Sequence, residues 1–375
     1  MKTDLPKAGI ATIGIPREIM IGEGRVALTP LACAQLVDAG ASVFVQTQAG
    51  IHSGYEDKEY QQHGAVIVTT TAELYGSAEL IVKVKQPLAE DLSQLKAHHT
   101  VFSYLHLAAD IALIDALCAT GLRAIPFESV ADDGGHLPLL APMSQVAGRI
   151  AVLRGASLLF RNRGGRGILL GGIDGAESGN VVVLGAGVAG SHAVDAAVSL
   201  GAQVDVLELN QDKLNSLHHR YPGIGVHLSD EATVSRLCQQ ADLVVGAVLL
   251  AGRRAPVVLR ESVVKAMMPG SVIVDIAIDQ GGCVEGIRQT DGEEICYTRH
   301  GVIHSAVPNM PAAVARTATQ SLSSAILPYV IALATGKPSE LDELARLDAA
   351  TAIAQGAIVD PVLVQEAERL HSVTD

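Results

Sequence analysis

Residues 180–190, NVVVLGAGVAG, decide the fold of this 375-residue chain. Three valines and a leucine predict a short buried strand, which turns through three glycines into a helix expected over about residues 191–200. In a dinucleotide site, Gly185 allows the tight turn, Gly187 lets the backbone approach a pyrophosphate, and Gly190 lets the helix lie close to its strand. The N-terminal end of such a helix favours phosphate. The segment therefore predicts a dinucleotide site, and the alternative is an ordinary βαβ unit with a glycine turn.

The strand after this helix strengthens the prediction. It is expected over residues 203–209, and Glu208 near its end lies about 20 residues beyond Gly187. A carboxylate at that distance accepts hydrogen bonds from the adenine ribose hydroxyls and repels a 2′-phosphate. We therefore expect NAD as the cofactor, in preference to NADP.

The α/β alternation continues on both sides of this motif. Before it, strands are expected over residues 10–15, 42–46, 66–69, 80–84, 101–105 and 123–127, and helices over residues 30–38, 72–78, 88–98 and 110–120. After it, strands are expected over residues 225–228, 243–248 and 272–278, and helices from residue 211 and over residues 230–239, 260–267 and 311–333. Such alternation predicts mostly parallel sheets with helices on both faces, so the fold class is α/β with two doubly wound domains.

The two domains are expected to be a Rossmann NAD-binding domain, residues 140–315, and a flavodoxin-like substrate domain, residues 1–139 with 316–375. A helix over residues 144–160, capped by Ser144, would cross from one to the other. The tail most simply packs back on the first half, which makes the substrate domain discontinuous. The glycine-rich run at residues 161–179 lacks Gly-Lys-Ser/Thr, so it is interpreted as a hairpin or surface loop.

Polar residues follow several of these strands. Ligands of doubly wound sheets bind beyond the carboxyl ends of the strands. Arg25 lies in the loop after the first strand, Lys85 ends LIVKVK before a proline, and His106 follows VFSYL. Two cations and an imidazole on one sheet rim can hold a small carboxylate and polarise the neighbouring carbonyl. The alternatives are structural: Lys83 and Lys85 can snorkel from a sheet edge, and a histidine at a helix start is often a surface or capping residue.

On the cofactor half, Asp279 follows the strand in VDIAIDQGG and falls on the cofactor rim, whereas Asp275 lies inside the strand and is interpreted as structural.

Composition limits the class of partner. Charged residues make up 18% of the chain and hydrophobic residues 49%, which suits buried parallel strands and subunit interfaces. A net charge of −13 argues against a nucleic-acid or anionic-membrane partner. Five cysteines without CxxC pairing indicate a reducing compartment and no metal cluster. No secretory pattern starts the chain, and the apolar run at residues 321–335 is interpreted as too short to span a membrane, so a cytoplasmic location is expected.

Several motifs together carry a family resemblance. They are GIPRE with RVALTP, VKVKQP, YLHLA, LPLLAPMSQVAGR, GAGVAG, ADLVVGAVL, VDIAIDQGG and PNMPAAVARTAT. In this order, over about residues 14–336, they resemble the alanine dehydrogenase family, which is related to the NAD(H)-binding subunit of proton-translocating transhydrogenase. Lys85 and Asp279 favour alanine dehydrogenase, because the transhydrogenase subunits have glutamine at the first position and lack the aspartate at the second.

The resemblance implies reversible, NAD-dependent oxidative deamination of L-alanine to pyruvate and ammonium. It implies that Arg25 and Lys85 bind the substrate carboxylate, that His106 acts as acid and base, and that Asp279 takes part in proton transfer. Besides the glycine turn, the positions that match the NAD site of the family are Ser144, Val188, Ala189, Glu208, Lys213, Ser229, Val248, Leu249, Ile276, Arg288, Asn309 and Met310. The family also implies a homo-oligomer, generally a hexamer. The other hypotheses are a transhydrogenase-like subunit and a family oxidoreductase for another small amino acid.

Overall fold

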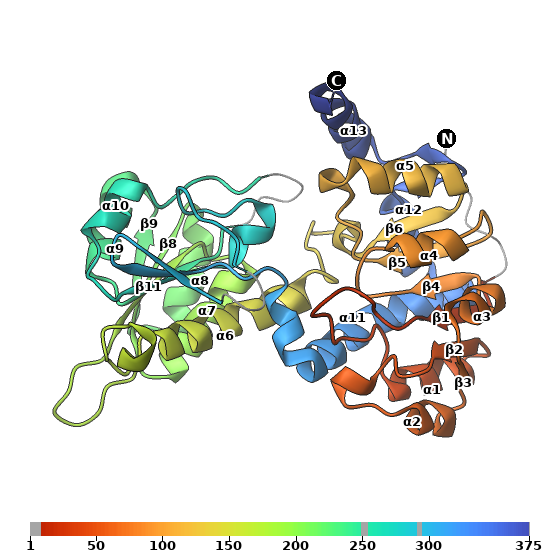
Figure 1. The fold of residues 1–375 in the computed structure, drawn as a ribbon, viewed down its shortest axis with the longest axis horizontal. Coiled ribbons are helices and arrows are strands. Elements are labelled where there is room, and N and C mark those ends of the chain that lie inside the picture. The colour runs from red at the N-terminus through yellow and green to blue at the C-terminus, as the bar shows by residue number, and fades with distance from the viewer. Residues whose placement is uncertain (1–8, 249–253, 291–294, 375) are drawn as a thin grey trace. The chain divides into compact units, whose positions relative to one another are not determined.

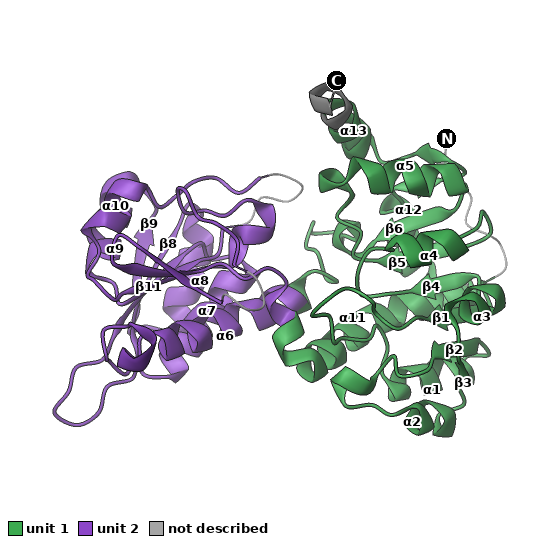
Figure 2. Cartoon of the chain, viewed as in Figure 1, with its two compact units in different colours: residues 1–142, 312–375 green, residues 143–311 purple. Residues whose placement is uncertain are grey.

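The computed structural model describes residues 9–248, 254–290 and 295–374, with only the backbone for residues 338 and 370–374. The chain divides into two compact units: unit 1 is Met1–Pro142 with Ala312–Asp375, and unit 2 is Met143–Pro311 (Figure 2). Unit 1 is discontinuous because the C-terminal segment returns to it after unit 2 is complete. The predicted domain limits lie within a few residues of these.

Unit 1 is built on an eight-stranded sheet with the order β15-β14-β6-β5-β4-β1-β2-β3 (Figure 1). Its strands are β1 (Thr12–Ile15), β2 (Ser42–Gln46), β3 (Val66–Val68), β4 (Leu80–Val82), β5 (Thr100–Ser103), β6 (Arg123–Pro126), β14 (Ile353–Ala354) and β15 (Ala357–Ile358). The first six are parallel, and the order reverses between β1 and β4. This is the flavodoxin-like order with one further parallel strand, β3, beyond β2.

Helices cover both faces of this sheet. They are α1 (Pro30–Asp38), α2 (Asp57–Gln62), α3 (Thr71–Ser77), α4 (Ala89–Gln94), α5 (Ile111–Thr120), α11 (Ala315–Thr335), α12 (Leu341–Ala349) and α13 (Pro361–Thr374). Leucines and other apolar residues of α3, α4, α5 and α13 share one buried cluster with the sheet. Helix α11 packs instead with α1 and α12. The tail does return to unit 1, as predicted: Ile353 of β14 pairs with Ala124 of β6.

Unit 2 has a seven-stranded sheet with the order β12-β13-β11-β10-β7-β8-β9. Its strands are β7 (Asn180–Leu184), β8 (Gln203–Glu208), β9 (Gly225–Leu228), β10 (Leu243–Gly246), β11 (Val272–Asp275), β12 (Tyr297–Arg299) and β13 (Val302–Ser305). Its helices are α6 (Ala141–Leu158), which begins in unit 1, α7 (Val188–Ser199), α8 (Gln211–Arg220), α9 (Glu231–Gln240) and α10 (Glu261–Ala266). Only β12 is antiparallel to its neighbour, and the order reverses between β7 and β10.

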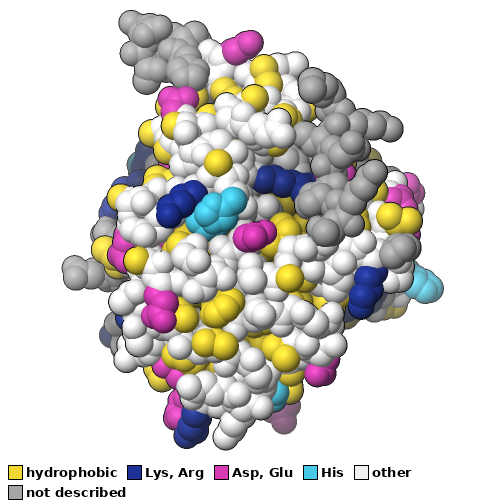
Figure 3. Space-filling model, turned by 90° about the vertical axis from the view of Figure 1, so that its right-hand side faces the viewer, with side chains coloured by type: hydrophobic (Ala, Val, Ile, Leu, Met, Phe, Trp, Pro, Cys, Tyr) yellow, Lys and Arg dark blue, Asp and Glu magenta, His cyan; other side chains and the backbone are white. Residues whose placement is uncertain are grey.

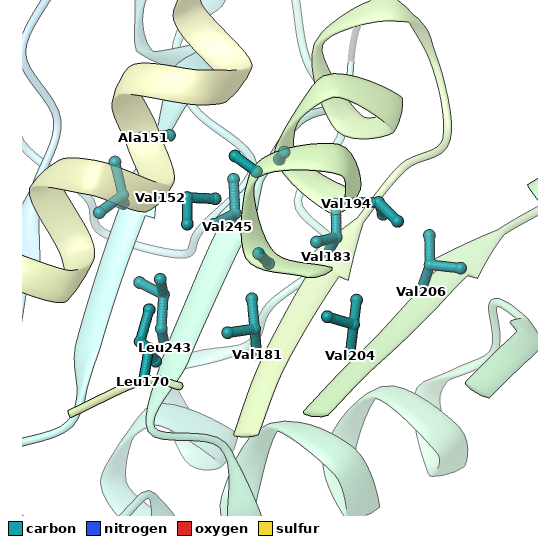
Figure 4. Close-up of a cluster of buried hydrophobic side chains, with 14 of the residues drawn as sticks. Ala151, Val152, Leu170, Val181, Val183, Val194, Val204, Val206, Leu243 and Val245 are labelled. Atoms are coloured by element: carbon teal, nitrogen blue, oxygen red, sulfur yellow. The ribbon is translucent and has the colours of Figure 1, made fainter. Parts of the chain in front are cut away.

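Alternation along the strands of unit 2 makes two cores. Val181 and Val183 of β7 point to the face covered by α6, α7 and α8, together with the matching residues of β8 and β10 (Figure 4). Val182 and Leu184 point to the opposite face, which α9 and α10 cover. A parallel sheet covered on both faces needs apolar residues at every position, which explains the uninterrupted VVVL. The two doubly wound domains predicted from the sequence are confirmed.

The apolar helical segment Met310–Thr335 differs from its sequence interpretation. It is 26 residues long and apolar enough, by length and composition alone, to cross a membrane, so the run judged too short belongs to a longer helix. Within unit 1 this helix is a core element: Leu322 and Ile326 are fully buried. Thr319 accepts a hydrogen bond from the amide of Val26 in the loop after β1. Packing against unit 1 therefore accounts for its apolar composition.

Several of the predicted strand and helix limits were wrong. Strands expected to reach residues 84 and 105 end at Val82 and Ser103. The amide of Val84 leaves the sheet and donates to Glu18 Oε1 at 2.6 Å. Helix α6 begins at Ala141, so Ser144 lies inside its first turn and is not the cap. Helix α2 was not predicted. The glycine-rich run 161–179 begins with the short 3-10 helix Arg161–Arg163 and continues as a loop with one isolated bridge, Ile173 with Ala176.

Candidate active site

The glycine turn after β7 has the geometry that a dinucleotide requires. Gly185 has φ 98°, a left-handed conformation that favours glycine. A Cβ on Gly190 would lie 1.8 Å from the carbonyl oxygen of Gly185, so only glycine lets α7 pack this closely. A Cβ on Gly187 would meet no described atom within 4 Å, so this glycine faces open space. Helix α7 begins at Val188, earlier than predicted, which puts its first amide groups directly behind Gly187.

Glu208 at the end of β8 is bound to this turn. Its Oε2 accepts the amide N–H of Ala186 at 2.8 Å, and its Oε1 accepts that of Leu209 at 2.8 Å. Lys213 Nζ lies 4.0 Å from Oε2. Burial would raise the pKa of Glu208, but these amides and Lys213 outweigh it and hold the pKa below its usual value. The carboxylate is therefore ionised beside the position expected for the adenine ribose.

Most other predicted cofactor residues also follow strand ends of unit 2. Val248 comes after β10, Ile276 after β11, and Asn309 after β13. Ser229 comes after β9, and its amide donates to the carbonyl of Glu208. Because the carboxyl ends of these parallel strands lie at one edge, the predicted residues lie along the rim that holds the glycine turn. Leu249 lies outside the described residues.

The remaining predicted cofactor residues differ in their surroundings. Ser144 lies one turn before Gly148, where a Cβ would come within 2.1 Å of the carbonyl oxygen of Ala189. This close contact brings the middle of α6 beside the first turn of α7. Arg288 is exposed and its guanidinium lies 4.0 Å from the ring centre of Tyr297. Met310 is 3% exposed and packs in the hydrophobic core of unit 2.

Asp279 is an exposed residue in the turn Ile276–Gln280 that follows β11. Asp275 holds this turn at both ends, since its Oδ1 accepts the amide of Ala277 at 2.9 Å and its Oδ2 that of Cys283 at 2.8 Å. Burial raises the pKa of Asp275 to about 6. The interpretation of Asp275 as structural agrees with these bonds.

In unit 1, the predicted substrate residues follow β1, β4 and β5, which are neighbours in the sheet. Arg25 lies in the loop after β1 and is 2% exposed. Its Nε and one terminal nitrogen donate to the two carboxylate oxygens of Glu23 at 2.7 and 2.6 Å. This fork fixes the guanidinium plane and neutralises the charge that burial would otherwise leave uncompensated.

Lys85 comes three residues after β4 and is partly buried, whereas Lys83 is 1% exposed. Lys83 Nζ lies 2.9 Å from Asp91 Oδ2 and 3.7 Å from Glu18 Oε2. Burial would lower the pKa of Lys83, but the two carboxylates outweigh it and raise the pKa. The amide of Leu88 also donates to Asp91. Lys83 therefore has the structural role that the sequence left open as an alternative. Its buried ion pairs with Asp91 and Glu18 hold the segment that carries Lys85.

His106 comes three residues after β5, and its side chain is 48% exposed. It adopts a left-handed backbone conformation with φ 50°. Its ring lies nearly parallel to that of Tyr104, with 6.0 Å between centroids. Tyr104 is itself fixed, since its hydroxyl donates to the carbonyl of Leu139 at 2.5 Å. The structure thus places Arg25, Lys85 and His106 at the carboxyl edge of three adjacent strands, at the point where the strand order reverses.

Comparison with known families identifies the family of the chain. The alanine dehydrogenase/PNT family model for the N-terminal domain matches residues 14–147, and the model for the C-terminal domain matches residues 151–361. Alanine dehydrogenase of Halomonas elongata is 45% identical over 323 residues, which cover 86% of this chain and 87% of the relative. That of Bacillus subtilis is 44% identical over 324 residues, with 86% and 85% covered. This chain belongs to the alanine dehydrogenase/PNT family.

Two solved structures extend the likeness to most of the chain. An L-alanine dehydrogenase superposes with a TM-score of 0.92 at 43% identity, covering 96% of this chain and 99% of that one. A transhydrogenase from Sinorhizobium meliloti superposes with a TM-score of 0.79 at 26% identity, covering 93% and 99%. The chain is thus similar to both branches of the family, with higher identity to the dehydrogenase.

Sequence reasoning missed three residues of the unit 1 rim that the structure brings into contact with predicted ones. Glu23 binds Arg25, Glu18 binds the backbone before Lys85, and Glu128 binds the backbone at His106. Glu18 and Glu128 each follow a strand within three residues, so the rule that selected Lys85 and His106 would also have selected them. Among the described residues, no group of three or more His, Cys, Asp or Glu side chains could hold a metal ion.

Proposed function

We propose that this chain is an NAD-dependent L-alanine dehydrogenase, which interconverts L-alanine with pyruvate and ammonium. The observation that carries the proposal is the placement of Arg25, Lys85 and His106 on adjacent strand ends of one sheet, in a chain of the alanine dehydrogenase/PNT family. A 2-oxo acid presents a carboxylate and a neighbouring carbonyl, and this rim offers two cations and an imidazole for them.

Arg25 and Lys85 bind the substrate carboxylate in this proposal. A guanidinium forms parallel hydrogen bonds with a carboxylate, while an ammonium acts as a point charge. The fork with Glu23 holds Arg25 in one orientation before substrate arrives, so little side-chain entropy is lost on binding. The buried network of Lys83, Asp91 and Glu18 similarly fixes the backbone that carries Lys85.

His106 and Asp279 carry the proton transfers. Deamination passes through an imine of the substrate, to which water must add before ammonium leaves. An imidazole is suited to this task in both directions, because it exchanges protons near neutral pH. His106 removes a proton from the water that attacks the imine carbon and returns it to the leaving nitrogen. Asp279 assists from the cofactor rim.

The residues of unit 2 fit NAD. The open side of Gly187 leaves room for a pyrophosphate at the start of α7. The carboxylate of Glu208 would accept hydrogen bonds from the adenine ribose hydroxyls. Ser144, Val188, Ala189, Lys213, Ser229, Val248, Leu249, Ile276, Arg288, Asn309 and Met310 complete the proposed site, Met310 from the core beneath it. When bound, NAD supplies the hydride acceptor for alanine oxidation.

We also propose a cytoplasmic homo-oligomer, a hexamer by family resemblance, without a nucleic-acid or membrane partner. Several large apolar side chains of unit 2 are exposed, among them Leu169, Ile173 and Leu209, at 56%, 71% and 79%. Such side chains suit subunit contacts. On the face of unit 1 that Figure 3 displays, charged side chains of both signs are scattered among uncharged ones. A face with charges of both signs supports the proposed absence of a nucleic-acid partner there.

The test is a steady-state assay of NADH formation with L-alanine, compared with glycine, L-serine and L-valine. The reverse reaction is measured with ammonium, NADH and a series of 2-oxo acids. We expect L-alanine and pyruvate to be the best pair, and 2-oxoglutarate to be the poorest because of its second carboxylate. His106→Ala, which retains the whole of unit 2, should bind NADH without turnover. NADH binding without alanine oxidation by the unmodified chain would favour the transhydrogenase-like alternative and contradict the proposal.

A further inference from the structure

Glu128 lies on the same rim as His106 and contacts it directly. It is the middle residue of the turn Phe127–Ser129, which follows β6, and β6 is the neighbour of β5. Glu128 Oε1 accepts the amide N–H of His106 at 2.6 Å, and both of its oxygens lie within 3.3 Å of the amide nitrogen of Leu105. The same Oε1 lies 4.0 Å from His106 Nδ1. One carboxylate therefore faces both the backbone and the ring of His106.

The backbone of His106 needs such a contact. Its φ of 50° and ψ of 36° lie in the left-handed region, which is uncommon for residues other than glycine, although asparagine, aspartate and histidine adopt it more often than the rest. Strained conformations persist where the surrounding structure holds them, and they gather at functional sites. The backbone also fixes the direction of the Cα–Cβ bond, so it decides where the imidazole points. The bonds from Glu128 to two successive amides therefore set the starting direction of the His106 side chain.

Glu128 is itself held firmly. Its neighbour Phe127 is fully buried and packs edge-on against Phe102 at 4.4 Å and Tyr104 at 5.0 Å between ring centroids. Phe102 belongs to β5, and Tyr104 continues that strand toward His106. The aromatic cluster thus ties the turn of Glu128 to the strand of His106. A short, buried connection of this kind keeps the carboxylate at a constant place relative to the amides that it binds.

The ring of Tyr104 also restricts the position of the His106 ring. The ring of Tyr104 is inclined at 12° to the imidazole plane, with 6.0 Å between the two ring centroids. The Glu128 carboxylate lies near Nδ1 of the ring, whereas Nε2 lies at its opposite end. A half-exposed histidine would otherwise sample several rotamers. These two neighbours restrict the rotamers of the His106 side chain.

We propose that Glu128 is a positioning residue for His106: it holds the strained backbone and the ring so that Nε2 faces the substrate carbonyl. This inference rests on the proposed function, because it assigns to His106 the proton transfer of alanine deamination. Glu128 acts through His106 and does not contact the substrate. No bond to the substrate is formed or broken by its carboxylate. Loss of Glu128 should therefore reduce turnover while it leaves the binding of both substrates nearly unchanged.

The experiment compares Glu128→Ala, Glu128→Asp and Glu128→Gln with the unmodified full-length chain. Glutamine keeps an oxygen at the position that accepts the His106 amide, whereas alanine removes it and aspartate withdraws it by one carbon. We expect kcat per NADH-binding site to fall by about a hundredfold for alanine and by about tenfold or more for aspartate, in line with the usual size of acid–base effects. Glutamine should restore most of the rate, although it lacks the charge. The KM values for pyruvate and NADH should change by less than about threefold.

The control is Asp133→Asn, a nearby carboxylate whose side chain is 94% exposed and should not affect kcat. NADH titration counts the folded sites, so a variant that merely unfolds loses sites but keeps kcat per site. Unchanged kcat in both Glu128→Ala and Glu128→Asp would overturn the inference. A large rise in the KM for pyruvate at constant kcat would also overturn it, because that would assign Glu128 to substrate binding. Absence of alanine oxidation by the unmodified chain would refute the proposed function and, with it, this inference.

Discussion

Two glycines of the turn after β7 should respond to the same substitution in opposite ways. Gly187→Ala places a methyl group where no described atom lies within 4 Å, at a φ of −69° that alanine tolerates. Gly190→Ala places it 1.8 Å from the carbonyl oxygen of Gly185. The first change therefore leaves the protein itself undisturbed, and the second forces α7 away from β7.

The magnitudes follow from these distances. A carbon and an oxygen need more than 3 Å between them, so Gly190→Ala requires a backbone shift that exceeds 1 Å. Overpacking of a well-filled core costs about 1–3 kcal/mol, and we expect at least this loss in the free energy of unfolding of unit 2. Gly187→Ala should change that free energy by less than about 1 kcal/mol, since alanine also restricts the unfolded chain. Its methyl group instead fills the space through which the backbone meets the pyrophosphate, and should weaken NADH binding by about tenfold or more.

The assay pairs urea denaturation with NADH titration by fluorescence, on both variants and on the unmodified chain. Gly76→Ala is the matched control for the added methyl group, because a Cβ there also meets no described atom within 4 Å and it lies outside unit 2. Undiminished NADH affinity in Gly187→Ala would refute the assignment of the turn to the pyrophosphate. Unchanged stability of Gly190→Ala would refute the packing argument.

Three further substitutions address the cofactor preference, the substrate cation and the pH dependence of stability. Glu208→Gln removes a charge whose repulsion of a 2′-phosphate at contact distance is worth about 1–4 kcal/mol. The ratio of kcat/KM for NADP to that for NAD should therefore rise by about fivefold or more. An unchanged ratio would contradict a role of Glu208 in cofactor preference. Arg25→Lys cannot form the fork with Glu23, so the KM for pyruvate should rise by about ten- to a hundredfold while that for NADH stays constant in steady-state kinetics; an unchanged KM for pyruvate would remove Arg25 from the substrate site. Asp275 has a folded-state pKa of about 6, above the ordinary 3.8, so its ionisation lowers stability as the pH rises through this interval. In urea denaturation, the free energy of unfolding of Asp275→Asn should decline less between pH 4.5 and pH 7 than that of the unmodified chain. An identical decline in the two proteins would count against this effect of Asp275 ionisation.

The helices and strands whose limits the sequence predicts have a clear local signal. Helix α1 and strands β2 and β9 have the predicted limits, because Pro30 starts the helix and apolar residues alternate or run together in the strands. Helix α2 escaped notice since DKEYQQ is short and polar and buries only Tyr60. Strands β14 and β15 have two residues each, too few for any period to show.

Some residues of the candidate site are likewise predictable from the sequence, and others are seen only in the structure. The glycine turn and Glu208 are local in sequence, so spacing alone predicts them. Arg25, Lys85 and His106 are distant from one another, but the topology of parallel strands brings their strand ends to one edge. The fork of Glu23 with Arg25 leaves no periodic signal, since it depends on the shape of a loop. Likewise, only the structure shows that Asp91 and Glu18 neutralise Lys83, whereas Lys85 lies at the rim.

The unit 1 rim shows a common design in which acidic residues hold the basic groups or their backbone. Glu23 accepts from the guanidinium of Arg25, Glu18 from the backbone before Lys85, and Glu128 from the backbone at His106. An isolated cation in a buried site would repel its neighbours and would be costly to desolvate. The carboxylate of Glu23 offsets part of this cost for Arg25, and all three carboxylates fix the geometry of the rim. Since each carboxylate acts on a different group, the three should be separable by kinetics: Glu23 and Glu18 through the KM for pyruvate, and Glu128 through kcat. A variant of Glu18 that lowered kcat alone would show that the segment of Lys85 serves the chemical step rather than binding.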